Sequence, residues 1–279
     1  MSLLSNAHTH TTYCDGKTPM PQMVQAAVEL GFVSLGLSGH AHQGFDPDYS
    51  MATDTQAAYF AHGRALQRSC RDLRLWVGLE LDAMADEPSR RMAFEQADFI
   101  IGSAHYLCSD YRGVPIAVDG DPAYLQRYVD DVFCGDGLAM AKAYFDMEVE
   151  ALLRDRPHII GHFDLVRKYA GELLLFSEDS AAYQKIALDA LQRAFACGGV
   201  LEVNTGGMAR GFLKTPYPTL PLLCAWREMG GRVTVTSDCH DARYLAFAHD
   251  AALALLKTAG FATVCRLGTG DDLWQEIAL

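Results

Sequence analysis

The segment Asn6-Ala7-His8-Thr9-His10 decides the fold class, because a short apolar run leads here directly into two side chains of metal-ligand type. The run Leu3–Ala7 has the length and composition of a strand that is buried on both faces. His8 and His10 stand two residues apart on an extended chain, so both imidazoles leave the same side and can share one ion.

The same arrangement, an apolar run followed by a residue of ligand type, returns along the chain. The further runs are Val33–Leu37, Leu73–Leu79, Phe99–Gly102, His158–Gly161, Val200–Val203 and Arg232–Thr236. The polar residues that follow them are, in order, His40, Glu80, His105, His162, Asn204, and the pair Asp238 and His240. The carboxyl ends of parallel strands in a barrel meet at one face, where active sites are built. We therefore expect these side chains to converge.

Helical patterns separate the predicted strands. Thr18 is expected to cap a helix that begins at Pro19 and ends at Gly31. Apolar residues at steps of three and four predict two more helices, over residues 183–195 and 248–259. Strands that alternate with helices in this way indicate right-handed βαβ units and a parallel sheet. Seven or eight such units favour an α/β fold of the (βα) barrel type, in one domain over residues 1–279, rather than an open doubly wound sheet.

Composition limits the class of protein. Of the 279 residues, 50% are apolar, which suffices for a core without disulfides. The formal charge of −12, without a Lys or Arg cluster, argues against nucleic acid or an anionic membrane as a partner. No apolar run approaches the ~20 residues of a membrane span. The eight cysteines include no CxxC pair, and nothing signals export, so reduced thiols in the cytoplasm are expected. The oligomeric state stays open.

The ligand types indicate which ions the site would hold. Asp238 and His240 repeat the spacing of His8 and His10 at the far end of the sequence. Imidazole with carboxylate, and without thiolate, suits zinc, manganese or iron better than magnesium or calcium. Two such pairs, together with the isolated ligands at other strand ends, predict a multinuclear metal site.

Taken in order, the motifs resemble those of the PHP superfamily (polymerase and histidinol phosphatase). The resemblance rests on His8-Thr9-His10-Thr11, Ser38-Gly39-His40, Glu80, Ser103-Ala104-His105, Gly161-His162-Phe163-Asp164 and Ser237-Asp238-Cys239-His240, which span most of the chain. Within the superfamily, Glu202-Val203-Asn204-Thr205-Gly206 and Pro216-Tyr217-Pro218 look like the histidinol-phosphate phosphatase branch. The resemblance implies a distorted TIM-like barrel of seven strands, (βα)7, and a centre of three metal ions.

Carried over residue by residue, the resemblance implies a ligand set for each ion. The first ion would be held by His8, His10, Glu80 and Asp238, the second by Glu80, His105 and His162, and the third by His40, His240 and Asp15. Some relatives have a histidine where this chain has Asp15. A plain turn at Cys14-Asp15-Gly16 is the alternative there.

The resemblance also implies hydrolysis of a phosphate monoester, and charge arithmetic agrees with it. Three divalent ions bring +6, while three carboxylates and a bridging hydroxide bring −4, which leaves about +2 for a phosphate dianion. The hydroxide would be the nucleophile. The residues expected to be catalytic are Glu80, Asp238 and His240, of which Asp238 or His240 would relay a proton to the leaving alkoxide.

Phosphate recognition calls for a cation beside the metal ions. Arg210, which follows Asn204-Thr205-Gly206-Gly207, is the first candidate for a bidentate clamp, with a plain surface ion pair as its alternative. Arg167 and Lys168, shortly after His162, are weaker candidates. His42 is either a substrate contact above the metal ions or a loop histidine that packs on Phe45.

The expected substrate is L-histidinol phosphate, because the resemblance is to that branch. The alternative is another PHP phosphoesterase, acting on a nucleotide or another small phosphate ester, since the metal ions contact only the phosphate. A nuclease would need a basic track that the sequence lacks, and a non-catalytic relative would lack ligands that are present here. The segments Gln43–Ala57 and Tyr106–Pro122 are expected to be irregular lids that decide the substrate. Their acidic residues Asp46, Asp48 and Asp119 can meet a substrate ammonium.

Overall fold

The computed structural model describes residues 4–279, so Leu3, the first residue of one predicted run, lies outside the described residues. The strands are β1 (Ser5–Asn6), β2 (Ser34–Leu37), β3 (Arg74–Val77), β4 (Leu79–Asp82), β5 (Ile100–Ser103), β6 (Tyr106–Tyr111), β7 (Val114–Ala117), β8 (Ile159–Ile160), β9 (Val200–Asn204), β10 (Val233–Thr236), β11 (Thr263–Leu267) and β12 (Trp274–Ala278). The helices are α1 (Met20–Glu29), α2 (Thr53–Ser69), α3 (Glu87–Gln96), α4 (Pro122–Phe133), α5 (Gly137–Asp155), α6 (Ala181–Ala194), α7 (Gly206–Ala209), α8 (Leu220–Glu228) and α9 (His249–Thr258). Three short 3-10 turns are η1 (Leu165–Arg167), η2 (Phe195–Cys197) and η3 (Ala242–Tyr244).

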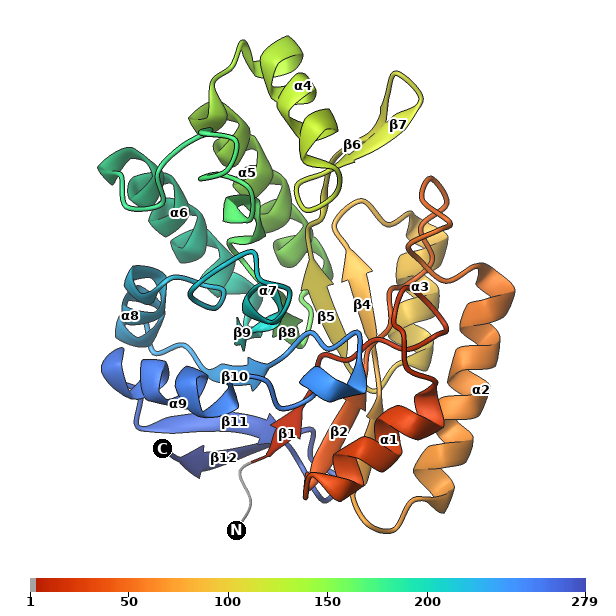
Figure 1. The fold of residues 1–279 in the computed structure, drawn as a ribbon. Helices are drawn as coiled ribbons and strands as arrows, with labels where there is room; N and C mark the ends of the chain where they lie inside the picture. Colours follow the sequence, from red (N-terminus) through yellow and green to blue (C-terminus); the bar gives the residue numbers. More distant parts are fainter. Residues whose placement is uncertain (1–3) are drawn as a thin grey trace.

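Two sheets made mainly of parallel strands form the centre of a mixed α/β fold, and helices cover them on the outside (Figure 1). The strand order is β1-β2-β3 in the smaller sheet and β12-β11-β10-β9-β8-β5-β4 in the larger one. Backbone hydrogen bonds join the two sheets at both sides. The N–H of His10 donates to the carbonyl of Cys239 (2.8 Å), and the N–H of Ala41 donates to the carbonyl of Glu80 (2.8 Å). The first strand of the chain therefore lies beside β10.

The run predicted at Leu73–Leu79 is divided between the two sheets at Gly78. β3 ends at Val77 and β4 begins at Leu79, so one predicted strand is two observed strands. A Cβ at position 78 would lie 2.6 Å from the ring of Phe99, and only glycine allows the backbone to pass so close. The break places Glu80 in the larger sheet, where it forms a bridge with His40.

The helices bury the faces that their apolar spacing predicts. α6 packs Tyr183, Ala187 and Leu191 into the core, and α9 packs Ala252 and Leu256. The first helix differs from its prediction at its start. Thr18 does not cap α1, because its hydroxyl oxygen accepts a hydrogen bond from the N–H of Ala242 (3.0 Å). Thr18 instead ties the start of α1 to the loop after β10.

The prediction of an irregular segment over Tyr106–Pro122 is wrong. β6 and β7 form an antiparallel hairpin that projects from the end of the molecule at the top of Figure 1. The other predicted lid, Gln43–Ala57, lacks regular structure only as far as Ala52, where α2 follows.

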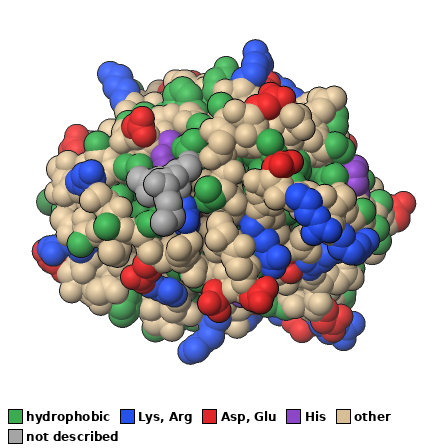
Figure 2. All heavy atoms as spheres, turned by 90° about the horizontal axis from the view of Figure 1, so that it is seen from below, with side chains coloured by type: hydrophobic (Ala, Val, Ile, Leu, Met, Phe, Trp, Pro, Cys, Tyr) green, Lys and Arg blue, Asp and Glu red, His purple; other side chains and the backbone are tan. Residues whose placement is uncertain are grey.

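The two ends of the central strands differ in character. The face seen from below in Figure 2 carries scattered charges of both signs and only isolated histidines. The histidines that follow strands gather at the opposite, carboxyl ends. Within residues 4–279, no helix has the length and apolar character needed to cross a bilayer.

Candidate metal centre

Nine side chains of ligand type converge at the carboxyl ends of the strands, as the sequence predicts. They are His8 and His10 after β1, Asp15 in the following turn, His40 after β2, Glu80 on β4, His105 after β5, His162 after β8, and Asp238 and His240 after β10. Seven of these side chains are at most 6% exposed, while Asp15 is 27% and His240 is 22% exposed. The cluster therefore has one side that solvent reaches.

The Glu80 carboxylate lies at the middle of the cluster. Its Oε2 atom is 3.0 Å from His40 Nδ1, 3.1 Å from His8 Nε2 and 3.4 Å from His10 Nε2. Its Oε1 atom is 3.0 Å from His162 Nε2 and 3.4 Å from His105 Nε2. One carboxylate is thus shared by five imidazoles, an arrangement suited to bridging ions.

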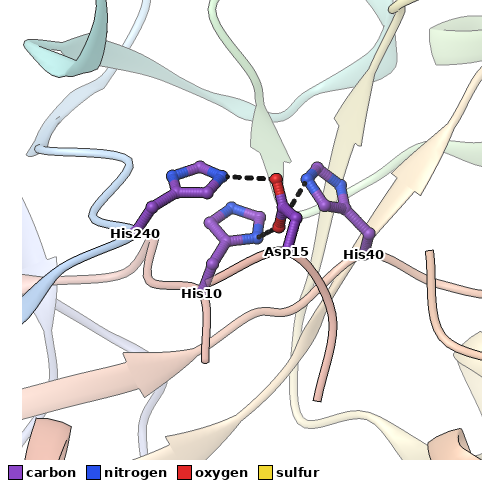
Figure 3. Close-up of side chains that lie close together, drawn as sticks. All are labelled: His10, Asp15, His40 and His240. Atoms are coloured by element: carbon purple, nitrogen blue, oxygen red, sulfur yellow. Dashed lines mark ion pairs between the residues drawn. The ribbon is translucent and has the colours of Figure 1, made fainter. Parts of the chain in front are cut away.

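Asp15 completes a second group nearer to solvent (Figure 3). Its carboxylate lies 3.0 Å from His240 Nε2 and 3.6 Å from both His10 Nδ1 and His40 Nε2. The chain does turn here, and a Cβ at Gly16 would lie 2.5 Å from the backbone of His10. The two alternatives for Asp15 are therefore compatible, because the turn is what aims its carboxylate at the histidines.

The donor atoms fit metal ions better than they fit one another. Within residues 4–279, the buried atoms His8 Nε2, His10 Nε2 and Glu80 Oε2 have no hydrogen-bond partner, which is unfavourable for polar atoms shielded from water. Four overlapping groups have ligand atoms close enough to hold an ion: His10, Asp15, His40 and His240; His8, His10 and Asp238; His8, Glu80 and His162; His40, Glu80 and His105. Imidazole nitrogen with carboxylate oxygen is a donor set for zinc, manganese or iron.

Two carboxylates behind the cluster orient its histidines. Glu202 Oε2 lies 2.9 Å from His8 Nδ1, and Asp82 Oδ2 lies 3.1 Å from His105 Nδ1. Each leaves the Nε2 atom of its histidine facing Glu80, which is how such carboxylates position metal-binding imidazoles. Neither residue was predicted from the sequence to have a role in the site. Asp82 stands two residues after Glu80, so the spacing rule applied to His8 and His10 would have found it.

Electrostatics favour the cation-binding forms of Glu80, Asp238 and His10. Burial opposes ionisation of Glu80, yet the imidazoles of His8 and His40 hold its pKa well below the usual value. Burial likewise opposes ionisation of Asp238, and Arg210 and His8 hold its pKa well below the usual value. Burial, with help from His240 and His40, lowers the pKa of His10 to about 3. At neutral pH the carboxylates are therefore ionised and His10 is neutral. The pKa values of three other imidazoles are raised against the effect of burial, because carboxylates lie beside them, so binding of an ion there would release protons; they are His8, His105 and His240.

A cavity of about 680 Å³ opens onto the cluster. Its wall includes the candidate cations Arg210 and Lys168. Arg210 reaches the cluster itself, with Nη2 2.9 Å from Asp238 Oδ2 and Nη1 3.2 Å from His240 Nδ1. Lys168 donates to the carbonyl of Asp119 (2.8 Å). Both predicted cations thus line the same cavity as the ligand cluster.

Two predicted substrate contacts lie outside this cavity. Arg167 is 1% exposed, and its guanidinium pairs with Asp164 (3.1 Å) and Glu178 (2.8 Å), so it has no free face for a phosphate. His42 is directed at the carbonyl of Met51, which lies 3.0 Å from its Nδ1. It is absent from the cavity wall, so the structure places it as a loop histidine. The structure therefore does not bring Arg167 or His42 to the cavity beside the ligand cluster.

Curated relatives align over most of the chain. A protein of Schizosaccharomyces pombe named "Probable histidinol-phosphatase" is 23% identical over 290 residues, which cover 98% of this chain and 91% of the relative. The histidinol-phosphatase of Saccharomyces cerevisiae is 22% identical over 295 residues, covering 88% of this chain and 85% of the relative.

Solved structures show the same fold, and a family model identifies the family. The crystal structure of hisK from Listeria monocytogenes matches with a TM-score of 0.74 at 20% identity, covering 88% of this chain and 98% of that one. That of histidinol phosphate phosphatase from Lactococcus lactis, complexed with zinc, L-histidinol and phosphate, matches with a TM-score of 0.63 at 20% identity, covering 94% and 95%. The PHP domain model matches residues 6–206, a range that holds every ligand of the cluster except Asp238 and His240. With the motifs, the fold and most of the length in agreement, the chain belongs to the PHP domain family.

Proposed function

We propose that this protein is a metal-dependent phosphomonoesterase that hydrolyses L-histidinol phosphate to L-histidinol and phosphate. The observation that carries the proposal is the cluster of nine ligand side chains on a cavity that also presents Arg210 and Lys168. The names of both curated relatives support this substrate, and the Lactococcus lactis structure holds both products of the reaction. The eight free cysteines support a cytoplasmic location.

The scaffold of this site is, in our proposal, a distorted (βα)7 barrel in a single domain over residues 1–279. Its seven positions would be β1, β2, β3 with β4, β5, β8, β9 and β10, all of which pair in parallel. The bridges Thr9 to Cys239 and His40 to Glu80 support closure, because the first joins the segments after β1 and β10 and the second joins the segment after β2 to β4.

We propose that the ligand cluster binds three metal ions, which are zinc, manganese or iron. The overlap of the four ligand groups supports this number, because Glu80, His8, His10 and His40 each belong to two groups. Bound divalent ions would activate a water molecule as nucleophile near neutral pH and offset charge on the phosphoryl group.

The remaining steps belong to side chains of this chain. Arg210 would donate to phosphoryl oxygens from its position beside Asp238, and Lys168 would add a second positive charge to the cavity wall. Asp238 or His240 would pass a proton to the departing alkoxide, since both line the cavity.

Asp119 is the proposed contact for the cationic part of the substrate. It lines the cavity, and its carboxylate lies 3.6 Å from Lys168 Nζ. Burial opposes its ionisation, but Lys168 lowers its pKa, so it is available as an anion. Asp46 is a weaker candidate because the hydroxyl of Tyr106 already donates to it (2.8 Å), and Asp48 is not part of the cavity wall.

The deciding experiment measures phosphate release from L-histidinol phosphate by protein loaded with zinc or manganese, beside nucleotides and sugar phosphates. A strong preference for histidinol phosphate is expected. Preferential turnover of another ester would assign the substrate to that class of ester, while the proposal of a metal-dependent phosphatase would stand. Absence of turnover with every ester would overturn the proposal.

Two variants connect the measured activity to this site. His105→Ala should abolish turnover and lower the metal content while the protein remains folded. Arg210→Ala should raise KM and weaken inhibition by free phosphate by roughly 10-fold or more, the loss expected for a charge-assisted hydrogen bond. Unchanged kinetics of either variant would remove that residue from the site.

A further inference from the structure

We propose that Tyr49 is a further substrate-contacting residue, whose phenol donates a hydrogen bond to a non-bridging phosphoryl oxygen. This inference rests on the phosphatase function proposed above. Tyr49 belongs to the segment between β2 and α2, which the sequence analysis treats only as a lid.

The ring of Tyr49 lies directly against the ligand cluster. Its centroid is 3.8 Å from that of His40 and 5.5 Å from that of His105. Tyr49 also lines the same cavity as Glu80, Arg210 and the other ligands. A molecule bound at the cluster would therefore come within reach of this phenol.

The hydroxyl of Tyr49 has no partner within the described residues 4–279. Its oxygen is buried, and it forms no hydrogen bond there. Two other buried tyrosines differ in this respect. The hydroxyl of Tyr106 donates to Asp46 (2.8 Å), and that of Tyr59 donates to the carbonyl of Gly78 (2.8 Å). A buried hydroxyl without a partner is unfavourable, so this one is suited to a partner that arrives with the substrate.

A phosphoryl oxygen is the acceptor that suits this position. The phenol is protonated at neutral pH and carries no charge, so it can donate to an anion without repelling cations at the cluster. A lysine or arginine against His40 would compete electrostatically with the ions. Tyr49 and Arg210 therefore have different roles. Tyr49 offers an uncharged donor beside His40, whereas Arg210 brings a positive charge beside Asp238.

Tyr49→Phe tests the proposal because it removes only the hydroxyl and keeps the ring against His40. Tyr13→Phe is the matched control, since the Tyr13 hydroxyl contacts His62 (3.0 Å) and Tyr13 is not part of the cavity wall. Both variants are loaded with zinc, and their zinc content and thermal unfolding are measured first. Inorganic phosphate is then titrated calorimetrically, and kcat/KM is measured with histidinol phosphate and p-nitrophenyl phosphate.

The expected result is a loss of about 10-fold or more in phosphate affinity and in kcat/KM for Tyr49→Phe, the size associated with a hydrogen bond to a charged acceptor. The loss should be similar for both esters, because they share the phosphoryl oxygens. Zinc content should be unchanged, and Tyr13→Phe should resemble the wild type.

Three outcomes would overturn the proposal: unchanged phosphate affinity in Tyr49→Phe, a loss confined to histidinol phosphate, or a loss of zinc that accounts for the lower affinity. If the wild type fails to hydrolyse histidinol phosphate, the function proposed above fails separately. The phosphate affinities of the two variants still decide the role of Tyr49.

Discussion

Two imidazoles of the cluster, those of His8 and His105, have a carboxylate behind them that determines which ring nitrogen faces Glu80. Asp82 accepts hydrogen bonds from both the backbone N–H (2.9 Å) and Nδ1 (3.1 Å) of His105. Glu202 accepts one from Nδ1 of His8 (2.9 Å) and another from the backbone N–H of His162 (2.6 Å). These contacts fix two loops as well as two rings.

Asp82→Asn should lower kcat and zinc affinity by roughly 10–100-fold, the usual cost of losing a carboxylate that orients a metal ligand. The amide can no longer enforce the tautomer with Nε2 toward Glu80. Zinc titration and steady-state kinetics check this. Asp130→Asn, at an exposed site on α4 where the carboxylate accepts from Gln126, is the control. Equal zinc affinity in Asp82→Asn and wild type would contradict the prediction.

The ligand residues at strand ends could be predicted from the sequence, whereas the orientation of Arg167 could not. Two features of the sequence identify four of the ligands, namely their spacing of two residues and their position after apolar runs. These ligands are His8, His10, Asp238 and His240. Arg167 has the residue type and approximate position of a phosphate ligand, but its direction depends on Glu178 and on the carbonyls of Thr215 and Pro216. The sequence around Arg167 cannot predict these contacts, because the partners lie far from it along the chain.

At the scale of elements, Arg167 connects η1 to the segments on either side of it in space. Its guanidinium pairs with Asp164, donates to the Thr215 carbonyl and lies 4.9 Å from the ring centre of Tyr217. Arg167→Ala would leave Asp164 buried without its cation. We expect unfolding by urea to become easier by about 3–5 kcal/mol.

The phosphate affinity of folded Arg167→Ala should remain near that of the wild type. Arg210→Ala should instead lose phosphate affinity and keep a stability to urea near that of the wild type. Urea denaturation and phosphate calorimetry on both variants separate the two roles. A large loss of phosphate affinity in folded Arg167→Ala would return this residue to the site.

Helix α5 carries a carboxyl group into the core. Glu148 is 1% exposed, and neither of its oxygens has a hydrogen-bond partner within residues 4–279. Burial, reinforced by Asp164, raises its pKa well above the usual value. Between the unfolded pKa of about 4.3 and this raised value, the folded protein holds a proton that the unfolded chain has released. Stability is therefore lost as pH rises through that window.

Glu148→Gln should remove this part of the pH dependence. The variant should resist urea better than the wild type at pH 8, and the difference should shrink by up to about 1.4 kcal/mol per pH unit as pH falls toward 5. Urea midpoints at several pH values check the expectation. Glu150→Gln, exposed on the same helix, is the control. Parallel curves for Glu148→Gln and wild type would show that the carboxyl is not the source.

The hairpin β6–β7 shows why one element escaped prediction. Its two-residue turn, Arg112-Gly113, has both residues at positive φ (55° and 84°), as tight hairpins require. Asn-Gly or Asp-Gly is the sequence that usually indicates such a turn. Arginine is not typical of the left-handed region, so Arg112-Gly113 does not predict one. β6 is also mostly exposed or half-buried, so it lacks the apolar run that marked the central strands.

At the scale of the whole molecule, the ligand cluster joins strands from both sheets and from both ends of the chain. Ions bound there would stabilise the folded state by mass action, since the unfolded chain does not assemble the site. Chelation should abolish phosphatase activity and lower the unfolding temperature by roughly 5–10 °C, as expected for about 2.7 kcal/mol at a hundredfold excess over Kd. Zinc or manganese should restore both, and dialysis without chelator is the control. An unfolding temperature indifferent to chelation would contradict a metal centre.

The parallel α/β character of the whole fold was predictable from the alternation of apolar runs with helical spacing. The division of the chain into two hydrogen-bonded sheets was not, because it depends on Gly78 passing Phe99. Neither were β11 and β12, which extend the larger sheet beyond the last ligand-bearing strand. Such features arise from contacts between distant segments, and periodicity in the sequence does not record them.

The pairing of Thr9 with Cys239 also sets an order of events during protein synthesis. In a nascent chain His8 and His10 leave the ribosome before the other ligands, and Asp238 and His240 leave it after them. At ~5–20 residues per second, the early histidines wait roughly 10–50 s for their partners. The complete ligand set is therefore present only after His240 has been synthesised, and a newly made chain can acquire its full set of ions only then or afterwards.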